Sequence, residues 1–526
     1  MELFRPSLQY PSYPYAEMLT HTAERYPEQT ALLFKNVSLT YRELESLVNS
    51  FANALLDRGI RKGQCVCLLM TNGPEYLISW FAIARIGAVA SPMNPSYKER
   101  EVAYQLSNSE ASALIVQQSL LPLIEMARAE SPALNCVVTV GSQPQQSQAL
   151  SFNHLVQTYP STPPTCEVPG WEDTVALPYS SGTTGLPKGV VLSHKNLVCN
   201  VCQSIATARI TFQDRMLVFL PLYHIYGIML MGLAAMTGAT IVLMERFDAE
   251  ECLRYIQEQG ITLLYTVPQV LSALLNSPQV DAYDLHTVRF AQCGAAPVPP
   301  VLAHRFQERT GITVMTSYGL TEASPGTHSN PVYDRRLIKV ETIGLPIHDT
   351  KQKIVDIETG EIELEVGEEG ELIVQGPQVM QGYWKAPEAT AAALRNGWLY
   401  TGDIGWRDKE GYITITDRKK EMIKYKGFSI APAQIEALLL EHPAVVDTAV
   451  IAKADNEVGE YPKAFVVLQS NSTEQSADEL MAWVNSQLAS YKQIREMEFI
   501  DAIPRNPSGK ILRRVLKERE QQIGQS

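Results

Sequence analysis

Short apolar runs alternate with segments of helical periodicity before residue 340, and this alternation constrains the fold more than any other feature of the chain. The apolar runs, which have the length of single strands, lie at 65–70, 113–116, 175–179, 240–243 and 288–293. The segments with helical spacing between them include 44–55, 76–85 and 249–259. Strands that alternate with helices predict an α/β fold with largely parallel sheets.

The segment 44–55 shows how clearly some of these helices are marked. Thr40 and Glu43 have the spacing of a capping box, in which each side chain bonds the other residue's backbone N–H. Apolar residues then recur at helical spacing until Gly59, which is typical of the residue that follows a helix. We therefore predict an amphipathic helix that begins after Thr40 and ends before Gly59.

The stretch from Met216 to Met244 contains no Lys, Arg, Asp or Glu. It is longer than the ~20 residues that a membrane-spanning helix needs. However, it also contains Pro221 and Gly227, and a β-branched run over 240–242 lies near its end. These residues favour a buried strand, loop, helix and strand over a membrane span.

The chain has 526 residues, which is more than one domain usually contains. From 341 to 416, short β-like runs with glycine turns replace the helices, for example at 361–366 and 371–374. The later segments alternate again, with helices expected near 432–441 and 477–488 and strands near 448–451 and 464–468. We predict a large multi-subdomain α/β domain with a β-rich portion over 1–416, and a small α+β domain over 417–526.

Composition and charge exclude several classes of protein. The net charge of −13, from 57 acidic and 44 basic residues, argues against a nucleic-acid-binding protein. Cys199 and Cys202 form a C-x-x-C, but no second pair stands at zinc spacing, so we interpret them as buried thiols. The N-terminus lacks the pattern of a signal peptide, which favours a cytoplasmic protein without a transmembrane segment. A homodimer is compatible with these features.

The run from Tyr179 to Gly189 reads YSSGTTGLPKG and carries the clearest chemistry. Its glycines and hydroxyls can bring several hydrogen-bond donors to a polyphosphate, and Lys188 adds a positive charge. The run is not a Walker A loop, because Pro187 occupies the position of that motif's second glycine. We interpret it as a phosphate-binding loop.

Further motifs follow in a fixed order, at 221–227, 294–297, 317–322, 400–403, 417–428 and 504–511. With the 179–189 run, they resemble the acyl-adenylate-forming superfamily, also called the AMP-binding family. That family includes acyl-CoA synthetases, 4-coumarate-CoA ligases, beetle luciferases and the adenylation domains of peptide synthetases. The resemblance covers nearly the whole chain, and the 424–428 segment is most similar to the 4-coumarate-CoA ligase branch.

The resemblance implies an ATP site. Its phosphate loop comprises Ser180, Ser181, Gly182, Thr183, Thr184, Gly185 and Lys188. The remaining nucleotide contacts that it implies are Gly294, Ala295, Ala296, Pro297, Ser317, Tyr318, Gly319, Thr321, Asp403, Arg418 and Lys510. In physical terms, the Tyr318 ring can stack on adenine and Asp403 can accept from the ribose hydroxyls. Glu322 can hold Mg²⁺, a hard cation that prefers oxygen ligands.

The resemblance also implies the acyl and coenzyme A (CoA) sites. The acyl pocket would comprise Tyr223, His224, Tyr226, Gly227 and Met229. The catalytic residues would be Lys510, His224, Glu322 and Lys424, with Asp417 as the hinge of a mobile C-terminal domain. Lys426, Gly427 and Phe428 would face CoA, although Ser429 departs from the glutamine usual in that branch.

The expected reaction is ATP-dependent ligation of a carboxylic acid to CoA through acyl-AMP, with Mg²⁺ as cofactor and ATP and CoA as co-substrates. Amino acids are disfavoured as substrates, because no acidic residue lies in 216–244 to pair with an ammonium. The apolar lining predicts a medium or long-chain fatty acid, and thus a role in fatty acid metabolism, with an arylpropenoic or benzoic acid as the alternative.

Three other functions remain open. A stand-alone ligase could load a carrier protein, although no carrier domain is recognisable in the chain. A luciferase-like oxidoreductase shares the motifs, but the final Ile-Gly-Gln-Ser is not a peroxisomal signal. A nucleotide sensor without catalysis is disfavoured because Lys510 and Glu322 are both present.

Overall fold

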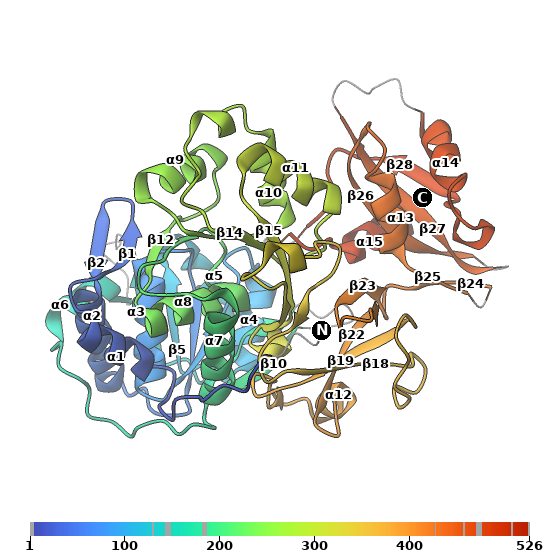
Figure 1. The fold of residues 1–526 in the computed structure, drawn as a ribbon. Coiled ribbons are helices and arrows are strands. Elements are labelled where there is room, and N and C mark those ends of the chain that lie inside the picture. Colours follow the sequence, from blue (N-terminus) through green and yellow to red (C-terminus); the bar gives the residue numbers. More distant parts are fainter. Residues whose placement is uncertain are drawn as a thin grey trace.

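Four β-sheets organise the protein, which we describe from a computed structural model (Figure 1). The structure describes residues 5–128, 131–141, 149–180, 187–426, 428–455, 458–469, 476–505 and 509–523. Two nine-stranded sheets and one five-stranded sheet form the large N-terminal part, and another five-stranded sheet forms the small C-terminal part. This mixed α/β architecture confirms the predicted fold class.

The first nine-stranded sheet has the order β17-β16-β15-β14-β13-β11-β12-β1-β2. Its strands are β1 (Thr30–Phe34), β2 (Val37–Thr40), β11 (Arg215–Val218), β12 (Thr240–Leu243), β13 (Leu263–Thr266), β14 (Phe290–Cys293), β15 (Val314–Gly319), β16 (Gly326–Ser329) and β17 (Leu345–Pro346). The connecting helices are α8 (Ile225–Thr237), α9 (Ala249–Gln259), α10 (Pro268–Asn276) and α11 (Pro300–Thr310). The strands from β1 to β15 in this order run parallel, as the α/β pattern predicts.

The uncharged stretch from Met216 to Met244 forms β11, a loop, α8 and β12, which confirms the predicted strand, loop, helix and strand. Nearly all of α8 is buried, because the helix lies inside the protein between other helices and the sheet. Among the described residues, no helix is both long and apolar enough to cross a membrane.

The second nine-stranded sheet has the order β20-β10-β8-β4-β3-β5-β6-β7, with β9 paired to β10. Its strands are β3 (Cys65–Leu69), β4 (Val89–Pro92), β5 (Ala113–Gln117), β6 (Cys136–Val140), β7 (Leu150–Ser151), β8 (Thr174–Ala176), β9 (Tyr179–Ser180), β10 (Lys188–Ser193) and β20 (Gly382–Tyr383). The helices of this part are α1 (Glu17–Arg25), α2 (Tyr41–Asp57), α3 (Pro74–Arg85), α4 (Glu99–Asn108), α5 (Pro122–Ala127), α6 (Phe152–Thr158) and α7 (His194–Ala208). The capping box at Thr40 is present as predicted.

The strand predicted over 175–179 is divided in the structure. β8 ends at Ala176 and β9 begins at Tyr179, and each pairs with a different part of β10. Pro178 lies at the break, and proline has no N–H to continue a ladder. The division matters for function because β9 leads directly into the glycine-rich run.

The first five-stranded sheet has the order β18-β19-β22-β21, with β23 paired to β22. Its elements are β18 (Lys351–Val355), β19 (Gly370–Gln375), β21 (Leu394–Arg395), β22 (Trp398–Arg407), β23 (Ile413–Arg418) and the helix α12 (Pro387–Ala393). The predicted strand over 371–374 is confirmed within β19. The predicted strand over 361–366 is reduced to an isolated antiparallel bridge between Glu363 and Val355, because the Asp356 carboxylate accepts from the backbone N–H groups of Thr359, Glu361 and Ile362 and turns the chain at the start of the segment.

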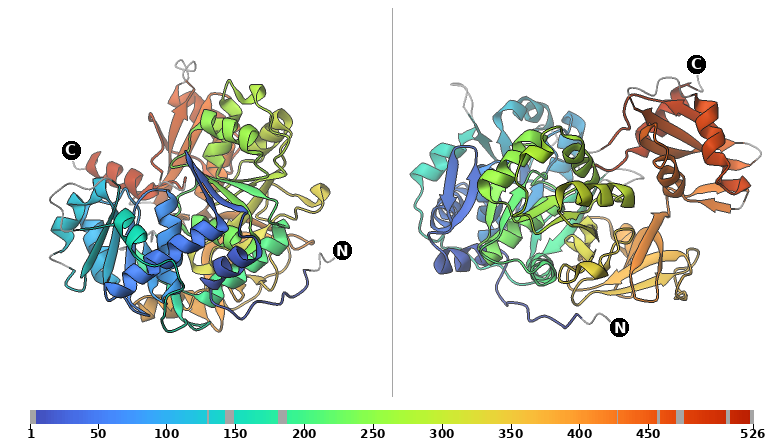
Figure 2. Two further views of the ribbon diagram at one scale, coloured as in Figure 1. Left: turned by 90° about the vertical axis from the view of Figure 1, so that its left-hand side faces the viewer. Right: turned by 45° about the horizontal axis from the view of Figure 1, so that its top comes forward.

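The C-terminal sheet has the order β25-β24-β27-β26, with β28 paired to β27. Its elements are β24 (Ile423–Tyr425), β25 (Phe428–Ile430), β26 (Val445–Asp455), β27 (Gly459–Leu468), β28 (Glu496–Phe499), α13 (Pro432–Leu439), α14 (Ala477–Asn485) and α15 (Arg513–Ile523). The predicted helices and strands of this region are confirmed, with longer strands than expected. This part has its own apolar core and lies to one side of the N-terminal sheets (Figure 2).

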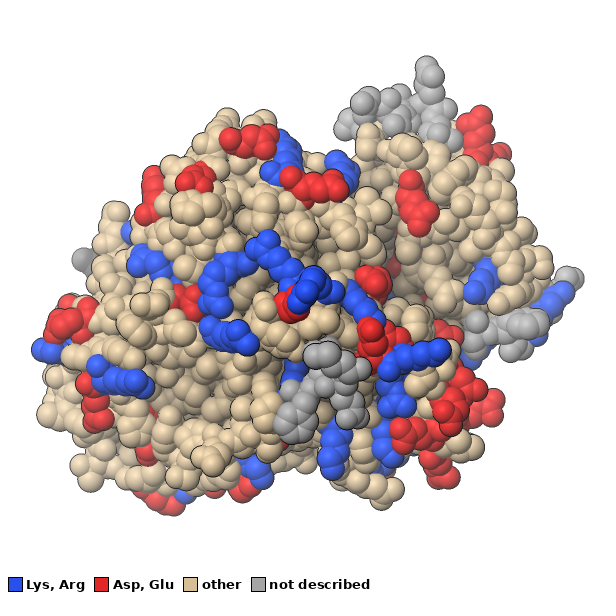
Figure 3. All heavy atoms as spheres, viewed as in Figure 1, with Lys and Arg blue, Asp and Glu red and all other residues tan. Residues whose placement is uncertain are grey.

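Charge is unevenly distributed on the face seen in Figure 3. Lys and Arg side chains form an arc across its middle that ends near the junction with the C-terminal part. Acidic side chains gather over the β18–β19 region, consistent with the glutamate-rich sequence between these strands. Although the chain is acidic overall, part of this face is basic, from its middle to the junction.

Candidate active site

A cavity of about 620 Å³ lies where the N-terminal sheets meet the C-terminal domain. Residues that follow the carboxyl ends of β14 and β15 line it, which is the edge of a parallel sheet where ligands usually bind. The predicted site residues that line it are Ser180, Lys188, His224, Tyr226, Met229, Gly294, Ala295, Ser317, Tyr318, Gly319, Thr321, Glu322, Arg418 and Lys510. These residues come from motifs spread over more than three hundred positions, and the fold brings them together.

Some predicted site residues do not line the cavity. They are Tyr223, Gly227, Ala296, Pro297, Asp403, Lys424 and Lys426. Ser181, Gly182, Thr183, Thr184, Gly185 and Gly427 lie outside the described residues, and only the backbone of Phe428 is described.

Other lining residues were not predicted from the sequence. They are Tyr104, Asn108, Ser204, Thr207, Ala208, Tyr265, Gln292, Leu320, Pro325, Gly326, His328, Ser329, Ile347, Tyr383, Trp384, Lys385, Ala386, Thr401, Gly402 and Lys420. A few of them stand inside the recognised motifs, but most come from helices and strands with no local signal. Their position depends on which elements pack together, so the sequence alone could not identify them.

The two described ends of the glycine-rich run lie side by side. Ser180 in β9 pairs with Lys188 in β10, and both residues line the cavity. The Lys188 ammonium lies 5.4 Å from the centre of the Tyr383 ring. Among the described lining residues, the only carboxylate is Glu322, whereas the cations are Lys188, Lys385, Arg418, Lys420 and Lys510. This excess of positive charge suits a polyphosphate.

Glu322 is held in place by its neighbours. It lies in the 3₁₀ turn η4 (Thr321–Ala323), and its Oε1 accepts a 2.8 Å hydrogen bond from the Tyr383 hydroxyl. Its backbone carbonyl accepts from Met380 N at 2.9 Å. The remaining lone pairs of the carboxylate can bind a cation in the cavity.

Tyr318, Asp403 and Arg418 form a connected group. The Tyr318 hydroxyl donates to Asp403 Oδ2, and Arg418 Nε donates to Asp403 Oδ1 at 2.9 Å. The Asp403 carboxylate is buried, so in this arrangement its oxygens face these two donors instead of the cavity. Each carboxylate oxygen has a second lone pair, which leaves acceptor capacity for ribose hydroxyls.

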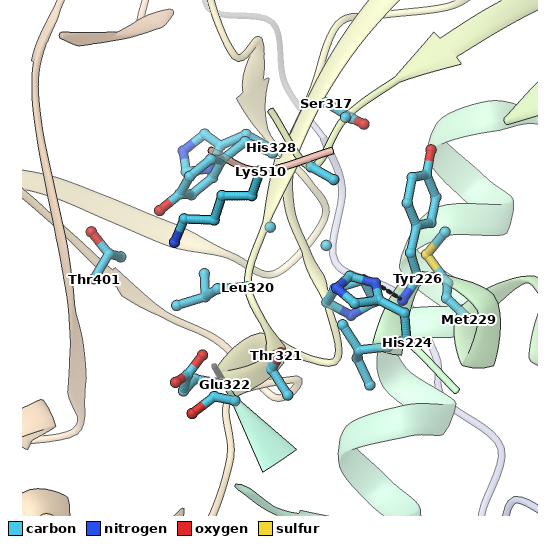
Figure 4. Close-up of a pocket in the computed structure, with 18 of the residues that line it drawn as sticks. His224, Tyr226, Met229, Ser317, Leu320, Thr321, Glu322, His328, Thr401 and Lys510 are labelled. Atoms are coloured by element: carbon cyan, nitrogen blue, oxygen red, sulfur yellow. Dashed lines mark hydrogen bonds between the residues drawn. The ribbon is translucent and has the colours of Figure 1, made fainter. Parts of the chain in front are cut away.

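His224 caps the N-terminus of α8. Its Nδ1 accepts from the backbone N–H of Tyr226 at 3.3 Å, drawn as a dashed line in Figure 4. Burial lowers the pKa of His224 to about 4, so the ring is neutral near pH 7. Because Nδ1 is the acceptor, the proton of the neutral ring lies on Nε2. His224 can therefore donate a hydrogen bond from Nε2 to an anionic group.

The side of the cavity where the acyl group is predicted to bind, here called the acyl side, is lined by residues of α7, α8 and β13. Tyr226 and Tyr265 meet edge to face with ring centres 6.1 Å apart, and Ser204 Oγ contacts Met229 Sδ at 3.5 Å. Thr207 Oγ1 and the Tyr265 hydroxyl also belong to the lining residues, and both are buried without a hydrogen-bond partner in the described part of the chain. This side is thus aromatic and apolar, with two unpaired hydroxyls.

Gly227 has a steric role that its predicted place in the acyl pocket did not suggest. A Cβ at this position would lie 2.3 Å from the Pro221 carbonyl oxygen and 2.7 Å from Leu222 Cα. Glycine therefore allows the loop before α8 to approach the helix closely. This approach sets the position of His224 at the start of the helix.

Lys510 enters the cavity from the C-terminal domain, on the side opposite to His224 and Tyr226 (Figure 4). Burial, together with the positive charge of Arg418, lowers the pKa of Lys510 to about 8. Figure 4 shows the ammonium end between Thr401 and Leu320. A cationic side chain thus reaches the N-terminal site from the other domain.

Asp417 lies in β23, where it pairs with Ile404 of β22, close to the connection between the two parts of the chain. Its Oδ2 accepts from Ala433 N at 3.0 Å, at the start of α13, so its side chain contacts the C-terminal domain. Burial raises the pKa of Asp417 to about 7. The position fits the predicted hinge, whose role remains a prediction.

Comparisons with known proteins agree with this geometry. The model of the AMP-binding enzyme family matches residues 19–384, and the model of the AMP-binding enzyme C-terminal domain matches residues 434–510. The chain is 37% identical over 493 residues to 4-coumarate–CoA ligase 1 of Petroselinum crispum, an alignment that covers 92% of this chain and 89% of that protein.

Two solved structures are similar over nearly the full length. The anthranilate CoA ligase AuaEII, in complex with anthranoyl-AMP, has a TM-score of 0.90 and 29% sequence identity. The match covers 98% of this chain and 99% of that protein. The Mycobacterium tuberculosis fatty acyl CoA synthetase has a TM-score of 0.77 and 32% sequence identity. The match covers 96% of this chain and 98% of that protein.

The chain therefore belongs to the AMP-binding enzyme family, which confirms the resemblance found in the sequence. It is an acid–thiol ligase, the class that these CoA ligases share, and it activates a carboxylic acid as an acyl adenylate.

Proposed function

We propose that this enzyme activates an aromatic acid, most readily an arylpropenoic acid, and transfers it to free CoA with release of AMP and pyrophosphate. The observation that carries this choice is that relatives with 36–38% identity over 91–92% of this chain are 4-coumarate–CoA ligases.

The shape of the acyl side supports the same choice. The edge-to-face rings of Tyr226 and Tyr265 offer the contacts that aromatic rings prefer. The similarity to 4-coumarate–CoA ligase 1 and to the anthranilate CoA ligase points in the same direction. The proposal thus replaces the fatty acid favoured by the sequence with the aromatic acid that was its alternative.

The nucleotide would lie on the polar side of the cavity. Lys188 and the 181–185 segment would bind the phosphates, the Tyr318 ring would stack on adenine, and Asp403 with Arg418 would bind the ribose. Gly294 and Ala295 line the cavity, and their small size would let a flat base approach the backbone. The cations that line this side support the binding of ATP.

Glu322 fits an Mg²⁺ site shared with ATP. Mg²⁺ is commonly bound by one or two carboxylates together with substrate phosphates and water. Glu322 is a single, well-oriented carboxylate among the described lining residues, which matches such a site. When bound, the ion would neutralise charge on the phosphate oxygens.

In the first half-reaction, the acid's carboxylate oxygen would attack the α-phosphorus of ATP and break its bond to the bridging oxygen, so that pyrophosphate leaves. The Lys510 ammonium and the Nε2–H of His224 would stabilise the negative charge that develops on the reacting oxygens. In the second half-reaction, the thiolate of CoA would attack the acyl carbonyl, and AMP would leave with the bonding electrons.

The second half-reaction would use another arrangement of the C-terminal domain. Lys424 and Lys426 are exposed and do not line the cavity in this arrangement. Rotation about Asp417 would withdraw Lys510 and bring Lys424, Lys426, Gly427 and Phe428 toward the acyl-AMP and CoA. The basic arc near the domain junction supports the approach of a phosphate-bearing cosubstrate (Figure 3).

A panel of acids tests the proposal. The enzyme would be incubated with ATP, Mg²⁺, CoA and 4-hydroxycinnamate, cinnamate, benzoate, octanoate or palmitate, and AMP release would be measured. We expect the highest kcat/KM with 4-hydroxycinnamate, and a Met229→Ala variant should change the ranking of the acids by ring size or chain length, because Met229 lines the cavity. Preference for octanoate or palmitate would contradict the aromatic choice, and no AMP release with any acid would contradict the ligase itself.

A further inference from the structure

One hydrogen bond joins the N-terminal domain to the loop that carries Lys510. Gln269 lies in the first turn of α10, and its Nε2 donates to the carbonyl oxygen of Gly509 at 3.0 Å. The two residues are 240 positions apart in the sequence, and Gly509 immediately precedes Lys510. The contact therefore ties the backbone beside Lys510 to the domain that forms most of the cavity.

The fit between the two residues is close. Gly509 has φ +85°, and a Cβ at this position would lie 2.3 Å from Gln269 Oε1. The same Gly509 carbonyl also accepts from Arg505 Nη1 at 2.8 Å, but Arg505 belongs to the C-terminal domain itself. Arg505 moves with Lys510 when the domain rotates, whereas Gln269 stays with the N-terminal domain.

We infer that Gln269 is a positioning residue that holds the Lys510 loop in the cavity during adenylation. This inference rests on the proposed function, in which Lys510 acts in the first half-reaction and leaves before the second. The hydrogen bond to Gly509 exists only while Lys510 occupies the cavity. Its loss should therefore impair formation of the acyl adenylate and leave attack by CoA unaffected.

The test measures the two half-reactions separately in Gln269 variants. Acid-dependent ATP–pyrophosphate exchange reports adenylation, and thioester formation from supplied acyl-AMP and CoA reports the second step. Gln269→Ala removes one donor, so exchange should fall about three- to tenfold, while thioester formation stays at the parental rate or rises. Gln269→Glu should reduce exchange further, because its ionised carboxylate cannot donate and faces the Gly509 carbonyl.

Two controls accompany these variants. Asn276→Ala changes an exposed residue at the other end of α10 and should leave both half-reactions unchanged. Lys510→Ala shows how large the loss is when the ammonium itself is absent. The thermal transitions of all variants would also be compared. General damage to α10 should lower the thermal transition and the rates of both half-reactions, whereas loss of the contact alone should lower only the rate of adenylation.

Other outcomes would overturn the inference. Unchanged exchange in both Gln269 variants, or equal losses in the two half-reactions, would show that the contact does not position Lys510 for adenylation. Failure of the proposed function would give a different result from failure of this inference. The parent enzyme itself would then show no pyrophosphate exchange with any acid of the panel.

Discussion

Individual side chains in the cavity owe their properties to burial and to specific neighbours. His224 is kept neutral by burial, and its cap on α8 assigns its proton to Nε2. Glu322 is oriented by the Tyr383 hydroxyl. Lys510 has a lowered pKa because it is buried beside the positive Arg418. These environments suit stabilisation of negative charge, which is what adenylation requires.

The pKa of Lys510 predicts the pH dependence of adenylation. The ammonium carries its charge below the pKa of about 8 and loses it above, so kcat/KM for adenylation should fall as pH rises through about 8. Lys510→Arg should have lower activity but no such fall, because a guanidinium stays charged above pH 12. The measurement is pyrophosphate exchange from pH 6 to 10. A parental profile without the fall, or the same fall in Lys510→Arg, would contradict this role of Lys510.

Glu322→Gln tests the proposed Mg²⁺ contact. The amide keeps the size of the side chain and can still accept from Tyr383, but it lacks the charge that a hard cation prefers. We expect the Mg²⁺ concentration for half-maximal adenylation to rise about tenfold, an order-of-magnitude expectation for one lost anionic ligand. Identical Mg²⁺ titration curves for mutant and parent would exclude Glu322 as a metal contact.

At the scale of elements, the helix α8 connects the fold to the acyl side. Its uncharged sequence reflects burial, since nearly all of its residues are inside the protein. His224 caps the N-terminal end of α8, and Tyr226 and Met229 in the first turns of this helix line the cavity. The close approach of the 221–222 loop to Gly227 fixes where this helix begins.

Gly227→Ala should destabilise the protein, although alanine normally favours a helix by about 1 kcal/mol over glycine. The added Cβ would overlap the Pro221 carbonyl, and overpacking of this kind costs typically about 1 to 3 kcal/mol. We expect a lower thermal transition, measured by scanning calorimetry or fluorescence. Gly170→Ala is the control, because Gly170 is exposed and a Cβ there would lie 3.2 Å from its nearest neighbour, an oxygen of the Asp173 side chain, instead of 2.3 Å from a backbone atom. Equal stability of Gly227→Ala and the parent would contradict the steric explanation.

At the scale of the whole molecule, the two domains share the cavity and are joined by polar contacts such as the one from Gln269 to Gly509. Lys510 and Gly509 approach the N-terminal domain from one side, and Asp417 contacts the start of α13 near the chain connection. Such an arrangement suits rotation of a small domain about a short connection, in which only a few hinge residues undergo large changes of φ and ψ. The structure represents the arrangement in which Lys510 lies in the cavity.

Replacing Asp417 with proline tests the proposed hinge. Proline fixes φ near −65° and should trap one arrangement of the domains. We expect one half-reaction to fall by on the order of tenfold or more while the other persists, measured with pyrophosphate exchange and with supplied acyl-AMP. Asp417→Asn is the matched control, because it removes the charge and keeps the backbone free. Parental rates of both half-reactions in Asp417→Pro would contradict rotation about this residue, once an unchanged thermal transition has shown that the variant folds.

The sequence by itself determined the elements and the motifs of this protein. The period of apolar residues, the capping box at Thr40 and the uncharged 216–244 stretch are local signals, and each produced the predicted element. The motif at 317–322 likewise predicted residues that line the cavity. At 361–366 the predicted strand shrinks to a single bridge at Glu363, because the Asp356 side chain competes for the backbone N–H groups of Glu361 and Ile362.

Only the tertiary structure decided which distant residues meet. The unpaired hydroxyls of Thr207 and Tyr265, the link from Tyr318 to Asp403, and the bond from Gln269 to Gly509 all join or place residues from separate elements. Such contacts depend on how sheets and helices pack, and a hydrogen bond forms only at distances near 3 Å and in narrow directions. Local sequence patterns determine neither how the elements pack nor the distance between two distant groups. The proposed positioning of Lys510 could therefore be inferred only from the folded structure.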